Sequence, residues 1–447
     1  MRSESESFEI LGRALAAASA DQADAVFVAS DRNISRFANS TIHQNMSEET
    51  AELILRVIIG GAAGVASTTV FDAGEIARTA GLARDAARHS KPIPGFRGLY
   101  AANEPAPLLR TFDQTTAQIS PRQKAETLRS AFDRARRVDA TFAGSYATAA
   151  RSVATANSNG VRRYCRITSA DATAIAVHAR GSGYATRCAR SCSSLDVAAL
   201  AGEALQKALL SSDAMATLEP GSWDVILEPA AVAEVLDWVN MIALSGQSFE
   251  DGSSFFVGNI GKRILGHNLT MADDAVDEDF LPFPFDLEGL PKRRVGLIEK
   301  GIPRTPVVDK AYADRLGVTA TANAWHLGSP EHGSAFHMAI NGGESTREDL
   351  IGSTERGIWV TRFNYVNGLL EPKTALMTGT TRDGTFLIRN GKVVARLPNL
   401  RWTQSIVEAF NRVEGMTRER RAIGTWYNPY GGTLVPVMKI RDWRFDL

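Results

Sequence analysis

The chain has 447 residues, of which 44% are apolar and 22% charged, and its 50 Lys and Arg residues balance 50 Asp and Glu residues. This length exceeds what one ordinary hydrophobic core accommodates, and the composition is typical of a soluble globular protein of roughly two or three domains. The balanced charge argues against a nucleic-acid partner, and no apolar run reaches the length that a membrane-spanning helix needs.

The first residues and the cysteines together predict a cytoplasmic protein. Residues 1–20 lack the charged and apolar regions of a signal peptide and have the pattern of an amphipathic helix. The cysteines are Cys165, Cys188 and Cys192, an odd number without zinc-site spacing, so we expect reduced thiols.

Residues 1–220 are expected to form an N-terminal α+β domain from two segments, each combining a strand meander with helices. The first segment, about 1–90, has three strand-like runs between residues 24 and 70. Gly60-Gly61 interrupts the third run and indicates a bulge or a turn. A helix is predicted over 73–89, where Asp72 and Glu75 have capping-box spacing.

The second segment, about 115–215, follows a Pro/Gly-rich connection. Its predicted elements are, in order, a helix from Ser120-Pro121 to about 137, strands at 142–156 and 161–178 joined by Asn159-Gly160, and a helix at 195–211. The triplets Ala38-Asn39-Ser40 and Ala156-Asn157-Ser158 each end a strand and precede further strand and helix, which raises the hypothesis of a duplication.

Residues 221–447 are expected to form a C-terminal domain with a large, mainly antiparallel sheet and flanking helices. It opens with a strand at 225–227 that runs into a helix with Pro229 in its first turn and Gly246 as its C-cap. Further helices are predicted at 307–316, from Ser345 onward and at 404–413, among hairpin-rich segments and a terminal strand.

The helix that begins at Pro229 lies where a strand runs into a helix, a common place for catalytic groups. Asp237 is its candidate general base, but we expect no second titratable group within helical reach to shift its pKa. A cap, a salt bridge or an interface contact is therefore the favoured role for Asp237.

Three histidines cluster in the stretch WHLGSPEHGSAFHMAI, at His326, His332 and His337. Their spacing fits neither one helix face nor a zinc finger, and Gly and Pro between them indicate a loop, so a structural or substrate-contacting role is favoured over metal binding. The acidic run from Asp273 to Asp279 lacks the alternation of a calcium loop and is expected to be solvated.

Several stretches, in order along nearly the whole chain, resemble the TldD/PmbA family, and specifically its TldE (PmbA) branch. They include SRFANSTIHQN, ANSNG, DVILEPAAVAEVLDWV, LSGQSFEDGSSFFVGNIGKRI, FDLEGLPKRRVGLIEKGIPR, VDKAYADRLGVTATANA and MTGTTRDGTFLIRNGKV. No single stretch is specific to the family, but their order is.

The resemblance implies a cytoplasmic proteolytic system of two related subunits acting on unfolded peptides or peptidic natural-product precursors. In the TldD subunit, H-E-x-x-x-H on a helix and a Cys near the C-terminus hold zinc, and the carboxylate activates water. Here Asp237, Trp238 and Ile242 stand at the motif positions, and the segment GTWYNPYGGTLVPV has no Cys. The resemblance therefore implies no metal or other cofactor in this chain and zinc in a TldD-like partner.

Two other functions stay open. The chain could be an amide hydrolase by itself, with a relocated site at His326, His332 and His337. It could also be a regulatory binding protein, such as the gyrase modulator of the family's older name, although the sequence shows no basic patch for DNA.

Overall fold

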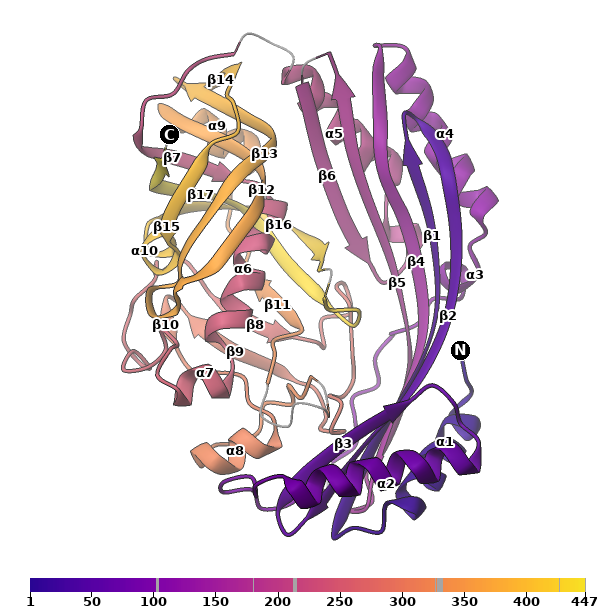
Figure 1. Ribbon diagram of the computed structural model, residues 1–447. Coiled ribbons are helices and arrows are strands. Elements are labelled where there is room, and N and C mark those ends of the chain that lie inside the picture. Colours follow the sequence, from indigo (N-terminus) through magenta and orange to yellow (C-terminus); the bar gives the residue numbers. More distant parts are fainter. Residues whose placement is uncertain are drawn as a thin grey trace.

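Two sheets stand side by side in the computed structural model, which describes residues 1–101, 104–179, 181–211, 215–325, 327, 333–425 and 427–446 (Figure 1). The N-terminal sheet lies on the right of Figure 1 and the C-terminal sheet on the left. This is the mixture of helices and large sheets that the sequence predicts, and the expected fold class is confirmed. None of the described helices is both long and apolar enough to cross a membrane.

The described residues form an antiparallel N-terminal sheet in the order β3-β2-β1-β4-β5-β6. Its strands are β1 (Gln22–Ala38), β2 (Thr41–Ile59), β3 (Ala62–Thr68), β4 (Ala140–Asn157), β5 (Arg162–His178) and β6 (Gly181–Ala189). Asn39 and Ser40 turn β1 into β2 with positive φ angles of 50° and 53°. Gly60 and Gly61, with φ of 56° and 79°, form the two-residue turn between β2 and β3, as such hairpins require.

Four helices cover one face of this sheet, which we call the outer face. They are α1 (Glu4–Ala18) and α2 (Ala73–His89) at one end, and α4 (Pro121–Arg136) and α5 (Val197–Leu210) at the other. The short α3 (Gln114–Gln118) and the 3-10 turn η1 (Cys192–Ser194) connect them. The order helix, three strands, helix therefore occurs twice, which supports a duplication. Strand β6 was not predicted from the sequence.

The C-terminal sheet is built around a ring of strands, β7 (Gly221–Leu227), β12 (Arg356–Glu371), β13 (Leu376–Arg389), β15 (Arg401–Ser405) and β17 (Gly432–Asp446). Each pairs with the next, and β17 pairs with both β15 and β7, so the ring closes. Only β7–β12 and β11–β17 are parallel among the described pairs. The rings of Phe363, Trp402 and Trp443 pack together in its core.

The remaining elements extend or cover this ring. The strands are β8 (Met271–Asp274), β9 (Arg294–Glu299), β10 (Ile302–Pro303), β11 (His337–Ile340), β14 (Lys392–Arg396) and β16 (Val413–Gly424). The helices are α6 (Pro229–Ala243), α7 (Gly246–Glu250), α8 (Lys310–Leu316), α9 (Arg347–Gly352), α10 (Ile406–Asn411) and the 3-10 turn η2 (Pro372–Thr374).

Two predicted helix ends are wrong. Gly246 does not cap α6, which ends at Ala243 with Leu244 as a right-handed C-cap; Ser245 caps α7 instead. Gly246 serves packing, because a Cβ there would lie 2.8 Å from Val308. The cap of α9 is Thr346, whose side chain accepts from the amide of Asp349, and not Ser345.

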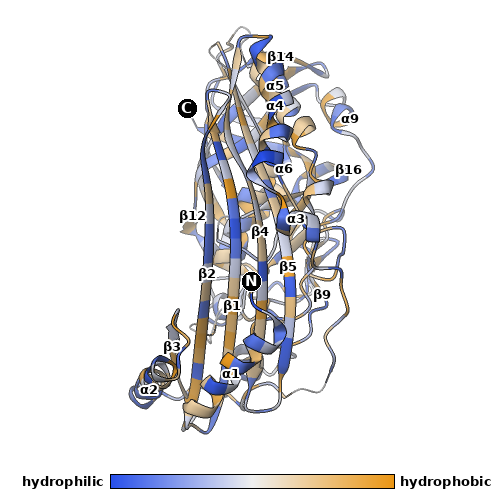
Figure 2. Ribbon diagram, turned by 90° about the vertical axis from the view of Figure 1, so that its right-hand side faces the viewer, coloured by the Kyte–Doolittle hydropathy of each residue, from blue (hydrophilic) through white to orange (hydrophobic). Residues whose placement is uncertain are grey.

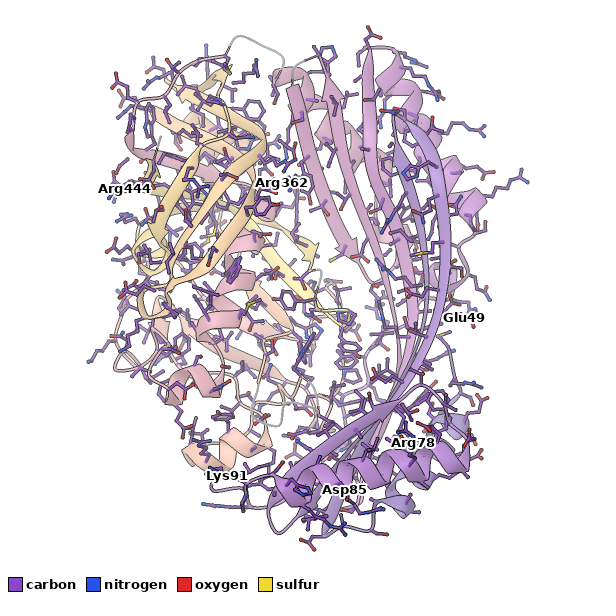
Figure 3. The ribbon with its side chains drawn as sticks, viewed as in Figure 1. Glu49, Arg78, Asp85, Lys91, Arg362 and Arg444 are labelled. Carbon is purple, nitrogen blue, oxygen red and sulfur yellow. The ribbon has the colours of Figure 1, made fainter. Side chains whose placement is uncertain are left out.

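A buried ionic cluster joins the two sheets. Arg56 on β2 donates to both carboxylate oxygens of Asp24 on β1, at 2.9 and 2.6 Å, and to Glu288 of the C-terminal half at 2.9 Å. All three side chains are almost completely buried. At the other end of the interface, Arg362 on β12 lies over the ring of Tyr184 on β6 (Figure 3).

Replacing Arg56 tests how strongly this cluster holds the halves together. Arg56→Met keeps most of the side-chain volume but leaves two carboxylates buried without their cation, so we expect a loss of about 3–5 kcal/mol in the free energy of unfolding. Arg78→Met is the matched control, because Arg78 is exposed on α2 (Figure 3) and its one ion pair among the described residues is with Glu75. It should leave that free energy unchanged within the error of the titration, because exposed ion pairs contribute little. Urea titration measures both, and equal effects would contradict the expectation.

Candidate functional site

Helix α6 packs into the core of the C-terminal half along most of its length. It starts at Pro229, directly after β7, and contacts β12, β16 and β17. Ile242 is only 6% exposed and belongs to the main apolar cluster. Trp238 lies on β12 at Gly368, where a Cβ would come within 2.8 Å of the indole. Two of the three motif positions are therefore occupied by packing side chains.

Asp237 lies on the side of α6 that faces the loop between β16 and β17. One of its carboxylate oxygens accepts from the hydroxyls of Tyr427 at 3.3 Å and Thr433 at 3.4 Å. Burial and, to a smaller extent, the neighbouring Glu234 carboxylate raise the pKa of Asp237 to about 8, against the lowering effect of those hydroxyls. The expectation that no titratable group lies in helical reach is wrong, since Glu234 is one turn earlier on α6.

The loop between β16 and β17 is held by backbone bonds and aromatic contacts. The Asn428 side chain donates to the Phe336 carbonyl at 2.7 Å and accepts from the amide of Gly431 at 3.0 Å. Tyr430 stacks on Phe283, with ring centroids 5.4 Å apart. This loop is the segment that resembles the family's cysteine region, so the structure brings it and the motif helix together.

A cavity of about 390 Å³ lies between this loop and the inner face of the N-terminal sheet, the face opposite α1, α2, α4 and α5. Its volume is within the range of small-molecule sites. The strands contribute small side chains to it, and the charged groups that line it are Arg32, Arg151, Asp171 and Arg190. None of these four residues was a candidate site residue in the sequence.

His337 is a buried structural residue on β11. Its Nε2 lies 3.2 Å from the Tyr430 carbonyl, and its ring stacks on Phe283. Burial lowers the pKa of His337 to about 4, so the imidazole is neutral near pH 7. His326 and His332 lie outside the described residues.

The acidic run is not uniformly solvated, contrary to expectation. Asp273 is completely buried, forms an ion pair with Lys292 at 3.1 Å and accepts from the amide of His337 at 2.7 Å. Because Lys292 and these hydrogen bonds outweigh burial, the pKa of Asp273 is lowered. The buried Lys292 compensates the charge of a carboxylate that is shielded from water.

The residues at the motif positions do not fit zinc. Trp238 and Ile242 have no ligating atom, and Asp237 is already bonded to two hydroxyls. Across the described part of the chain, no three His, Cys, Asp or Glu side chains are grouped to hold a metal ion.

Comparisons with known proteins bear on the family and on the fold. Residues 220–446 match the PmbA/TldA metallopeptidase C-terminal domain, and residues 115–211 match its central domain. The metalloprotease PmbA of Escherichia coli O157:H7 is 24% identical over 84% of this chain and 82% of its own length.

Other relatives are matched over part of their length or by fold. A metalloprotease TldD homologue of Buchnera aphidicola is 27% identical over 47% of this chain and 44% of its own length. The chain thus spans about half the length of the first curated relatives that it matches. The crystal structure of TldE from Thermococcus kodakarensis superposes with a TM-score of 0.88 at 19% identity, covering 100% of both chains, and shows a shared fold.

The raised pKa of Asp237 predicts a pH-dependent stability. Its folded value of about 8 exceeds its ordinary value of 3.8, so the group favours the folded state at low pH, and this contribution is lost as the pH rises through the folded pKa. Asp237→Asn removes the titration. The variant should gain stability relative to the wild type between about pH 4 and pH 8, by at most about 1.4 kcal/mol per pH unit.

Urea titrations across this pH range measure the difference. Asp85→Asn, at an exposed site on α2, is the control and should follow the wild-type curve (Figure 3). Parallel curves for wild type and Asp237→Asn would show that the carboxyl group titrates alike in the folded and unfolded chains.

Proposed function

The chain belongs to the PmbA/TldD metallopeptidase family, and we propose that it is the non-catalytic, TldE-like subunit of a zinc-dependent peptidase. A TldD-like partner would carry the metal, in the cytoplasm. The observation that carries this proposal is the packing of α6. Trp238 and Ile242 fill space at the motif positions, and Asp237 is tied to Tyr427 and Thr433.

An unusual exposed segment of β12 supports a partner contact. Tyr365 is 88% exposed and has a φ of 51°, at a point where the pairing with β13 shifts register. Positive φ is rare for a bulky residue, and residues strained in this way cluster at functional sites. Leu369 and Leu370 follow on the same strand, 65% and 50% exposed. Exposed apolar side chains gathered in this way are typical of interfaces.

The substrate class we propose is peptidic: unfolded peptides or precursors of peptidic natural products. The cavity supports this, because its floor is a β-sheet face of small side chains and its roof is a loop, surfaces that suit an extended chain. Such a cavity contacts mainly the backbone of a bound peptide. It therefore suits substrates of varied amino-acid sequence.

The alternative of an independent hydrolase gains no support from His337, which is buried and engaged with Tyr430. Its decisive test is metal analysis of the isolated chain. Stoichiometric zinc, together with activity that His332→Ala abolishes, would replace the proposed function.

Co-expression with a TldD-like chain tests the assignment directly. We expect a stable complex of equal stoichiometry, with peptidase activity only when both chains are present. Zinc measured by mass spectrometry should follow the TldD-like chain. Two results would overturn the proposal: no complex, or full activity of the TldD-like chain alone.

The exposed segment of β12 has its own test. Leu369→Glu places a charge in the proposed interface and should weaken the complex by about 2–4 kcal/mol, or roughly 30-fold or more. Leu82→Glu is the matched control, since Leu82 is 48% exposed on α2, at the far end of the N-terminal half. Analytical ultracentrifugation measures both affinities. An unchanged affinity for Leu369→Glu would place the interface elsewhere.

A further inference from the structure

The cavity beside the loop between β16 and β17 has a positively charged lining. Arg151 projects from β4, Arg32 from β1, and Arg190 follows β6, while Asp171 on β5 is the acidic side chain among the described lining residues. Ser145, Ala147, Ala149 and Ser169 are the small side chains of the same face, and they leave the guanidinium groups room. The described lining thus carries three positive charges and one negative charge.

The guanidinium of Arg151 is buried without a counterion. Arg151 is only 9% exposed, and its hydrogen bond to the Ser169 hydroxyl is long, at 3.4 Å. No carboxylate of the described residues lies within ion-pair distance of it. Burial lowers the pKa of Arg151, and the neighbouring Tyr430 and Asp171 offset this effect only in part. Arg190 adds a second unmet donor, because its buried Nε has no acceptor among the described groups.

Arginines in a second cavity, at the start of α6, show the opposite pattern. This cavity has a volume of about 420 Å³ and contains Arg347, Arg418 and Arg421. Each is paired with a carboxylate: Arg347 with Glu228 at 3.5 Å, Arg418 with Glu344 at 3.4 Å, and Arg421 with Glu203 at 2.7 Å. The unpaired guanidinium in the first cavity is therefore a local feature.

We propose that the cavity at Arg151 binds a carboxylate group of a peptide, with Arg151 as the principal contact and Arg32 and Arg190 as supporting charges. A buried guanidinium without a partner is unfavourable, and a carboxylate is the planar acceptor that matches its paired donors. The carboxylate comes either from the peptide's C-terminus or from an Asp or Glu side chain. The peptidic nature of the ligand rests on the proposed function; the anion site rests on the geometry alone.

The negative charge of Asp171 is expected to weaken the binding of a carboxylate in this cavity. Its carboxylate lines the same cavity, and Gly424, the last residue of β16, lies so close that a Cβ there would come within 2.7 Å of Asp171 Oδ1. An incoming carboxylate is repelled by Asp171 and attracted by Arg151. Removing the two charges one at a time should therefore change the affinity in opposite directions.

Isothermal titration of the full-length chain with short Ala/Ser peptides tests the proposal. One peptide has a free C-terminus, a second has a C-terminal amide, and a third has the amide and one internal Glu. We expect binding of the first or the third and at least about tenfold weaker binding of the second. The first against the third decides between a terminal and a side-chain carboxylate.

Variants identify the residues responsible. Arg151→Met should weaken the carboxylate-dependent binding at least about tenfold, and Asp171→Asn should strengthen it, a gain that a folding defect cannot produce. Arg418→Met in the second cavity is the control and should bind as the wild type does. Binding should also weaken as salt concentration rises.

Equal binding of all three peptides, no binding of any, or binding indifferent to Arg151 would overturn the proposal. The outcome is independent of the partner chain. A chain that binds carboxylates but forms no complex keeps this inference and removes the proposed function; an active complex that is indifferent to Arg151 does the reverse.

Discussion

Side chains alternate between the two faces of β1, β4 and β5 along their full length, and the rest of the molecule depends on this two-residue period. On the outer face, residues such as Phe142 and Tyr146 pack under α4 and α5. On the inner face, Val153 and Ile167 meet Phe283 of the C-terminal half. Figure 2 shows polar and apolar residues interspersed along these strands. Because the strands are long, the inner face extends beyond that contact, and its small residues form the floor of the cavity.

Helix α6 shows how a fold keeps a position while the chemistry there changes. Its entry from β7 and its packing against β12 and β17 depend on apolar residues, which are independent of any metal. Burial and the neighbouring Glu234 carboxylate raise the pKa of Asp237 and make it a weak acid, although the hydroxyls of Tyr427 and Thr433 lower that pKa. Such a group donates or accepts a hydrogen bond according to pH, and it links α6 to the loop that roofs the cavity.

Local sequence signals predicted most elements, because their causes are local. Pro229 starts α6, Asn159-Gly160 turns β4 into β5, and Gly317 ends α8 with a left-handed φ of 68°. The misses have tertiary causes. Gly246 is required for close packing against Val308, which is more than 60 residues away in the sequence. The local pattern that predicted a helix cap contains no information about that contact.

In the candidate site, too, some features were predictable from the sequence and others depend on tertiary contacts. Family resemblance placed the motif helix and the cysteine-free loop, and the hydrogen bond from Tyr427 to Asp237 joins them. The cavity could not be predicted from single segments, because Arg32 and Arg151 meet only through the pairing of β1 with β4. The spacing of Glu234 and Asp237, by contrast, was visible in the sequence, since residues three apart share a helix face.

Charge compensation separates the arginines that hold this fold together from those available to a ligand. At the contact between the sheets, Arg56 meets two carboxylates, and Arg421 meets Glu203 of α5. In these ion pairs the carboxylates accept the hydrogen bonds of the guanidinium groups. They therefore join the two halves without leaving a charged group unpaired. Arg151 is buried to a similar degree on the same sheet, yet the described chain gives it one long hydrogen bond to a hydroxyl. Burying a guanidinium group without a charged acceptor is unfavourable for the free protein. A bound anion would supply the charged acceptor that Arg151 lacks among the described residues.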